Sequence, residues 1–201
     1  RNTLTLSILL VFCANLVTGQ QLVQNPEPST KGARGQATAQ FMQAEPSKPL
    51  PNPLINKSLA LNEGFDDISS LVPGGWFMQN NSDPAGITEW FQGNDGVFPA
   101  YDGDPIAYIA ANWNNVSGTG TISNWLVTPE LSIVNGNEIR FRTRTAAGTT
   151  WPDRLQLRMS LSGSSTDVGT FATDVGDFNT LLLDINATYT LVDYPDNWTE
   201  F

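Results

Sequence analysis

Carboxylates are the most abundant reactive side chains in this chain, and they are concentrated in its second part. Residues 61–201 contain 18 of the 20 acidic residues but only 5 of the 10 basic ones, a net charge of −13. The same part has no histidine, cysteine or lysine. A Ser-His-Asp triad, a Cys-His pair, a histidine-bearing zinc site and a lysine Schiff base are therefore excluded within it. We expect no enzyme activity, with a glycosidase-like carboxylate pair as the alternative.

The positions of the acids suggest a calcium site instead. Ca²⁺ takes about six to eight oxygen ligands from carboxylates, amides and carbonyls. One cluster lies near the start of the acidic part and another on a glycine-bearing stretch: Glu63, Asp66 and Asp67, then Asp95, Asp102 and Asp104. Neither has the spacing of an EF-hand loop. The alternative is that these residues only form turns, in which Asp and Gly are common.

Arginines and tryptophans are the candidates for ligand binding. Arg140, Arg142 and Arg144 share one strand face, because side chains alternate along a strand. Arg154 and Arg158 share a face of the expected strand 153–162, and if the two strands pair, the five arginines form a basic stripe that suits an acidic glycan or a partner's carboxylates. Cross-strand ion pairs are the simpler interpretation, and the one that we favour.

Six tryptophans are present, and their sequence contexts differ. Trp113 and Trp151 fall in expected loops, where an exposed indole ring can stack on a sugar. Trp76 and Trp125 lie in expected strands, and we expect them in the core. Five N-x-Ser/Thr sequons begin at Asn56, Asn80, Asn115, Asn186 and Asn197. The acidic surface repels phosphate backbones and anionic lipid, so we expect an extracellular glycan or protein ligand and no nucleic acid.

Three regions differ in composition. Residues 1–19 have the basic start, apolar stretch and small residues of a secretory signal peptide. That apolar stretch is too short for a permanent membrane span, so we expect a secreted or cell-surface fragment without one. Residues 20–58 are rich in proline and predict a disordered linker. Residues 59–201 contain the strand patterns of one domain.

Short strands separated by Gly, Pro, Asn and Asp turns predict an all-β fold, an antiparallel β-sandwich of the jelly-roll type. The expected strands are 61–68, 76–78, 88–92, 106–110, 124–133, 138–145, 153–162, 181–185, 189–192 and one that begins at 198. Residues 112–121 are expected to form a polar loop. Pro129 cannot donate to a ladder and marks an edge, a bulge or a strand end. A strand pattern reaches Phe201, so we expect the jelly roll to be truncated at its C-terminus.

Three motifs carry a resemblance to a known family. They are Gly64-Phe65-Asp66-Asp67, Gly75-Trp76 and Asn124-Trp125-Leu126-Val127-Thr128-Pro129-Glu130-Leu131. In order and spacing, across 61–162, they resemble the choice-of-anchor J and cleaved-adhesin domains of bacterial secreted and surface proteins. That family is similar in fold to MAM-type jelly rolls. The family's closing strands have no counterpart in this sequence.

The resemblance implies a function and a set of metal ligands. Members are non-catalytic modules of surface adhesins and of large secreted peptidases, and several bind calcium. It therefore implies an adhesion or glycan-binding module stabilised by calcium, or alternatively an accessory domain of a larger secreted peptidase or other hydrolase. Asp66 matches the acidic position of the first motif and is the leading metal ligand. Glu63, Asp102 and Asp153 are further candidates that match no firm motif position.

Overall fold

The computed structural model describes the backbone strand at residues 4–12 and, in full, residues 61–133 and 136–201. In these ranges the strands are β1 (Leu4–Phe12), β2 (Phe77–Asn80), β3 (Asp83–Ala85), β4 (Phe91–Gln92), β5 (Ile109–Ala110), β6 (Val116–Thr121), β7 (Asn124–Val127), β8 (Leu131–Ile133), β9 (Arg142–Thr143), β10 (Leu155–Ser160), β11 (Thr180–Ile185) and β12 (Thr199–Glu200). The helical elements there are two 3-10 turns, η1 (Ile68–Ser70) and η2 (Trp113–Asn115). Every described strand pair is antiparallel, which confirms the all-β prediction. The jelly-roll topology stays a prediction.

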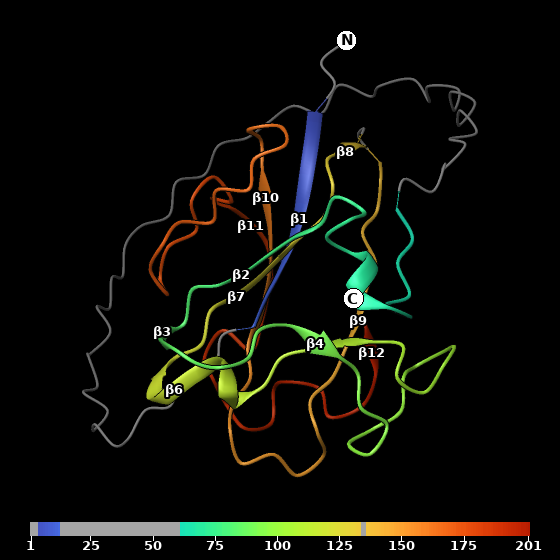
Figure 1. Ribbon diagram of the computed structural model, residues 1–201, viewed down its shortest axis with the longest axis vertical. Coiled ribbons are helices and arrows are strands. Elements are labelled where there is room, and N and C mark those ends of the chain that lie inside the picture. The colour runs from blue at the N-terminus through green and yellow to red at the C-terminus, as the bar shows by residue number, and fades with distance from the viewer. Residues whose placement is uncertain (1–3, 13–60, 134–135) are drawn as a thin grey trace, which may run out of the picture. The chain divides into compact units, whose positions relative to one another are not determined.

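The largest sheet has six strands, and β1 runs through its middle (Figure 1). The strand order is β11-β10-β1-β7-β2, and β8 pairs with the start of β1. Three two-stranded sheets accompany it, β12-β9, β3-β6 and β4-β5. Strand β1 belongs to the same compact unit as residues 61–201. The expected linker 20–58 and the sequon at Asn56 lie outside the described residues.

Strand β7 divides the core into two clusters because successive side chains point to opposite faces. On one face Trp125 and Val127 pack with Val168 and Phe178. On the other face Leu126 packs with a second group of buried residues: Leu71, Trp76 and Trp90. The core positions expected for Trp76 and Trp125 are therefore confirmed.

A third cluster lies at β10, where Leu155 packs with Ile185 and Tyr194. Strand β10 thus rests on a different set of apolar residues from β7. The strong alternation predicted for 153–162 gives a strand of six residues, of which four are buried.

The expected strand at 124–133 is interrupted where the proline predicted it. Strand β7 ends at Val127 and β8 begins at Leu131, so residues 128–130 separate two ladders. Pro129 lies in this gap, consistent with its missing backbone donor. It also contacts the preceding turn, since a Cβ at Gly75 would lie 3.6 Å from the Pro129 ring.

Two expected strands are absent because side chains there form hydrogen bonds with the backbone of nearby residues. Residues 61–68 form no strand: Phe65 has φ +57°, and Asp67 caps η1 by accepting a hydrogen bond from the Ser69 amide at 2.9 Å. Residues 189–192 are also non-strand. There the Asn186 side chain accepts from the Thr190 amide and donates to the Thr190 carbonyl, both at 2.8 Å. Such local bonds compete with a ladder.

Two further expectations were wrong, one about a loop and one about strand pairing. The stretch 112–121 is no loop but η2 followed by β6, which pairs with β3. Strand 138–145 shrinks to β9 and pairs with β12, not with β10. Both edges of β10 are already occupied, by β1 and by β11, so no edge is left for β9. The arginines of the two segments therefore do not form one paired stripe.

Within the described ranges, no helix has the length and apolar character that a bilayer crossing requires. Strand β1 lies inside the predicted signal peptide at 1–19. Cleavage of that peptide, and with it secretion, stays a prediction.

Candidate functional site

A shallow depression of about 200 Å³ lies where η2 meets the β3–β6 pair. Trp113 and Ile87 both line it, and 72% and 91% of their surfaces are exposed. Asn114 and Ser117 add polar groups to a lining that is otherwise mainly apolar. An exposed indole offers a flat apolar face on which a ring can stack, and the polar side chains beside it can form hydrogen bonds.

Hydrogen bonds of the backbone hold Trp113 in this position. Asn112 caps η2: its side chain accepts from the Asn114 amide at 2.9 Å, and its amide donates to Asn115 Oδ1 at 2.8 Å. Asn115 is completely buried, and its Nδ2 donates to the Thr88 carbonyl at 3.1 Å. The turn is thus anchored from inside while the indole itself stays in solvent.

Glycine is required at position 86, where the chain after β3 passes close to the backbone of η2. A Cβ at Gly86 would lie 2.0 Å from the Asn114 carbonyl oxygen, closer than any side chain allows. The Gly86 amide donates to the Asn115 carbonyl at 2.9 Å. Close backbone approach therefore fixes one wall of the depression before any ligand binds.

Trp151, the second predicted sugar-stacking residue, is 54% exposed and lies outside this depression. Its backbone amide donates to Thr149 Oγ1 at 3.3 Å. The structure therefore does not bring the two candidate tryptophans to one site.

The candidate arginines on 140–144 make ion pairs and ring contacts within the chain. Arg140 pairs with Glu138 at 2.9 Å, and Arg142 pairs across the strands with Glu200. The Arg142 guanidinium also lies over the Tyr101 ring, 3.9 Å from its centroid. These contacts agree with the ion-pair interpretation favoured from sequence.

Arg144 joins an aromatic cluster. Its guanidinium lies 4.3 Å from the Phe98 ring centroid and donates to the Asp196 carbonyl at 2.5 Å. Phe98 stacks on Tyr108 with centroids 5.0 Å apart, and Trp198 meets both rings edge-on. Arg144 thus ties the 94–108 loop region to the end of the chain, and a ligand role for the three arginines stays a prediction.

The four candidate metal ligands are not assembled into one site. Within 61–133 and 136–201, no three His, Cys, Asp or Glu residues are placed to hold a metal ion together. Glu63 is engaged with the Phe65 amide at 2.7 Å, and Asp102 Oδ1 accepts from the Gly103 amide at 2.9 Å. Asp66 is exposed and lies beside the same loop, since a Cβ at Gly103 would be 3.6 Å from Asp66 Oδ1.

Asp153, the fourth candidate, is engaged in hydrogen bonds within the chain. Its carboxylate accepts from Thr145 Oγ1 at 2.5 Å, and its backbone carbonyl accepts from Asn186 Nδ2 at 2.7 Å. Burial raises the pKa of Asp153, because the charged form loses hydration there. Burial likewise raises the pKa of nearby Tyr194, whose hydroxyl lies 2.6 Å from Thr143 Oγ1. This group fixes the backbone next to β10.

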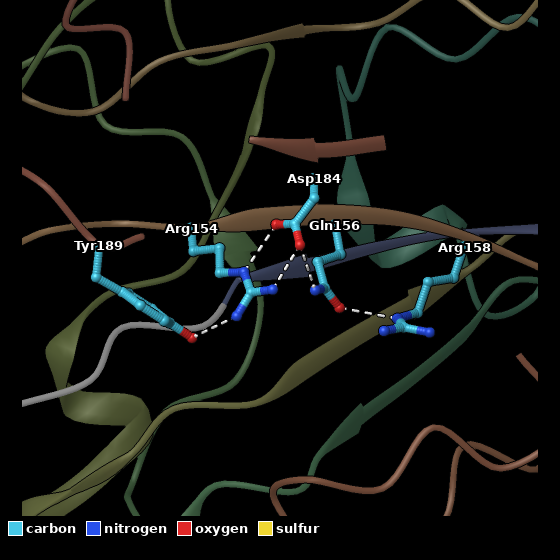
Figure 2. Close-up of polar contacts among 5 residues, drawn as sticks. All are labelled: Arg154, Gln156, Arg158, Asp184 and Tyr189. Carbon is cyan, nitrogen blue, oxygen red and sulfur yellow. Dashed lines mark hydrogen bonds and ion pairs between the residues drawn. The ribbon is translucent and has the colours of Figure 1, made fainter. Parts of the chain in front are cut away.

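Arg154 makes a cross-strand ion pair with Asp184, of the kind favoured from sequence, within a wider polar network around β10 and β11 that sequence reasoning did not predict (Figure 2). Arg154 binds Asp184 with two nitrogens, at 2.7 and 2.5 Å, and donates to the Tyr189 hydroxyl at 3.1 Å. Gln156 donates to Asp184 at 3.0 Å and accepts from Arg158 at 2.8 Å. The hydrogen bonds from Arg154 lower the pKa of Asp184. The alternating pattern of 153–162 indicated the strand next to Arg154. It could not identify Asp184 as the partner of Arg154, because the two residues are 30 positions apart in the sequence.

The sequons differ in accessibility. Asn115 is completely buried, Asn186 is 7% exposed, and the Asn80 side chain donates to two backbone carbonyls. Asn197 is the described sequon whose asparagine is exposed. A glycan attached to any of the first three would displace bonds that hold the fold.

Compared with family models, curated proteins and solved structures, the chain matches none. The resemblance to choice-of-anchor J and cleaved-adhesin domains therefore depends on the quoted motifs alone.

Proposed function

We propose that this chain is a non-catalytic, secreted or cell-surface module that binds a glycan at the Trp113 depression. The observation that carries the proposal is the 72% exposed indole of Trp113, which lines a depression together with polar residues, on a turn that hydrogen bonds of the buried Asn115 hold in place. A volume of about 200 Å³ is smaller than the pockets that enclose drug-sized ligands, so it fits one ring of a longer chain lying on the surface. The −13 charge of 61–201 favours a neutral sugar over an acidic one.

Glycan binding is expected to depend on Trp113 and not on Trp151. Loss of ring stacking in Trp113→Ala should weaken binding of the best glycan from an array by at least about tenfold. The matched control, Trp151→Ala, removes an exposed indole outside the depression and should change the affinity by less than about twofold. Titration calorimetry on the wild type and both variants measures this. Equal losses in the two variants, or no binding by the wild type to a broad array, would contradict the proposal.

Calcium is proposed as a stabilising ion with Asp66 as its leading ligand. The support is the exposure of Asp66 next to the Gly103 loop and the family resemblance. An ion that binds only the folded state must stabilise it, by about 2.7 kcal/mol when the free ion is 100-fold above its dissociation constant.

The thermal midpoint is therefore expected to rise by several degrees in millimolar calcium relative to chelator, and the rise should disappear in Asp66→Asn. Magnesium at the same concentration controls for general screening of the acidic surface. Identical midpoints with calcium and with chelator would remove the metal from the proposal and leave glycan binding untouched.

A further inference from the structure

Strand β1 completes the main sheet from a segment far away in the sequence. Leu9–Phe12 pairs with Asn124–Val127 of β7, and Ser7–Phe12 pairs with Leu155–Ser160 of β10. All four residues of β7 are buried. Buried backbone donors and acceptors need partners, so these two strands require a strand between them.

The two halves of the sheet rest on separate cores. Strand β7 is anchored by the clusters around Trp125 and Leu126, and β10 by the cluster around Leu155. In the strand order of the described residues, β1 is what joins β2-β7 to β10-β11 (Figure 1). The loop residues Val168 and Phe178, which follow β10 in the chain, also reach the Trp125 cluster. The two halves can therefore stay together while the strand between them is exchanged.

A specific kind of strand fits this place. All four residues of β7 and four of the six residues of β10 are buried, and a strand that is covered on both faces is apolar on both faces. It must run antiparallel to both neighbours and supply six residues opposite β10. The five residues Ile8–Phe12 form an unbroken apolar run at this position.

The same run is the apolar core of the predicted signal peptide at 1–19. Removal of that peptide would take β1 out of the sheet and leave β7 and β10 facing an empty place. We propose that the space between β7 and β10 is an acceptor site for an exchangeable strand. Leu4–Phe12 fills it in this chain, and an extended apolar segment of a partner polypeptide replaces it after the leader is removed. This inference depends on the secretion part of the proposed function.

Strand exchange can be measured on the full chain. A protease site inserted after Gln40 allows the chain to be cut between β1 and residues 61–201. The probe is a fluorescent peptide of Leu4–Phe12 with a solubilising lysine tail. We expect stoichiometric uptake, with displacement of the fragment and continued hydrogen-exchange protection of Asn124–Val127 and Leu155–Ser160. A peptide carrying Leu10→Pro, which lacks one ladder donor and fixes φ, should bind at least about tenfold more weakly.

Three results would overturn the proposal. A fragment that stays bound and never exchanges would make β1 a permanent strand. Protection of β7 and β10 that persists after the fragment has left, with no peptide added, would show that no acceptor exists. Dimerisation of the cut chain in place of peptide uptake would assign the site to a second copy.

Failure of the proposed function gives a different result from failure of the strand exchange. Glycan affinity is measured on the uncut chain, and peptide uptake does not enter it. N-terminal sequencing of exported protein reports leader removal by itself. A chain exported with residues 4–12 intact would contradict the replacement step even where the peptide exchanges in the cut protein.

Discussion

Trp125→Ala is expected to lower the free energy of unfolding by about 3–5 kcal/mol, the usual range for removing a buried aromatic side chain. Trp125 is 1% exposed and packs against Phe178 with ring centroids 5.8 Å apart. Its indole nitrogen donates to Ser123 Oγ at 3.2 Å, so alanine also leaves a buried hydroxyl without this partner. The cavity would open between β7 and the Val168–Phe178 loop, which cannot collapse without moving the strand.

Urea unfolding followed by fluorescence measures this loss, provided that the slope against urea is unchanged. Trp113→Ala is the matched control, since it deletes the same atoms from a residue that is 72% exposed. That variant should stay within about 0.5 kcal/mol of the wild type, as surface substitutions do. A small loss in Trp125→Ala, or an equal loss in both variants, would contradict the assignment of the Asn124–Val127 segment to the core.

The sequence predicted well where the pattern itself depends on burial. The run Asn124–Val127 is buried throughout, and the alternating stretch 153–162 contains β10. Pro129 predicted an interruption because its missing donor is a local property. Such features need no knowledge of the partner strand, and the all-β class followed from them.

Pairing and small strands were not predictable in the same way. Strands β9 and β12 are 56 residues apart at the paired Thr143 and Thr199, and no tight turn sets their register. Strand β6 has the composition of a loop, since Val116–Thr121 contains two glycines, and only its pairing with β3 makes it a strand. Strand β1 lies within the predicted leader, because a composition that suits a signal peptide also suits a strand covered on both faces; leader removal stays a prediction.

In the candidate site, too, local properties could be predicted from the sequence and long-range contacts could not. Exposure of Trp113 followed from its polar surroundings, and the structure places it on a depression. Assembly of the acids could not be predicted, because 18 carboxylates allow many pairs and only the fold decides which ones meet. Asn124 is a second residue whose environment could not be predicted from the sequence. Its amide is completely buried, and neither polar atom of the side chain has a hydrogen-bond partner in the described part of the structure.

Arg154→Met is expected to destabilise the protein by about 1–3 kcal/mol, more than any single exposed ion pair contributes. The Arg154 and Asp184 side chains are only 21% and 17% exposed, and Arg154 binds both carboxylate oxygens. Methionine retains the apolar length of the side chain but leaves Asp184 with only the hydrogen bond from Gln156 in the described structure. A partly buried carboxylate that loses its cation retains the cost of desolvation without the compensating charge.

A double-mutant cycle separates this pair from the packing around it. Arg154→Met, Asp184→Asn and the double variant should give a coupling energy of about 1–2 kcal/mol. Arg140→Met is the control: its side chain is 68% exposed and pairs with Glu138, so the loss should be below about 0.5 kcal/mol. A coupling energy between Arg154 and Asp184 that is no larger than the loss in Arg140→Met would show that this pair contributes no more than an exposed ion pair.

The effect of Arg154→Met should also depend on pH with a definite sign. Arg154 holds the pKa of Asp184 below its ordinary 3.8, so the folded state binds this proton less readily than the unfolded chain. The stabilisation is therefore complete above the unfolded pKa and is lost as pH falls through the lower folded value. The stability difference between wild type and Arg154→Met should be constant from neutral pH down to about 5 and should narrow below about 4. A stability difference that widens in acid would require a different charged partner for Arg154, because protonation of Asp184 can only weaken the Arg154–Asp184 ion pair.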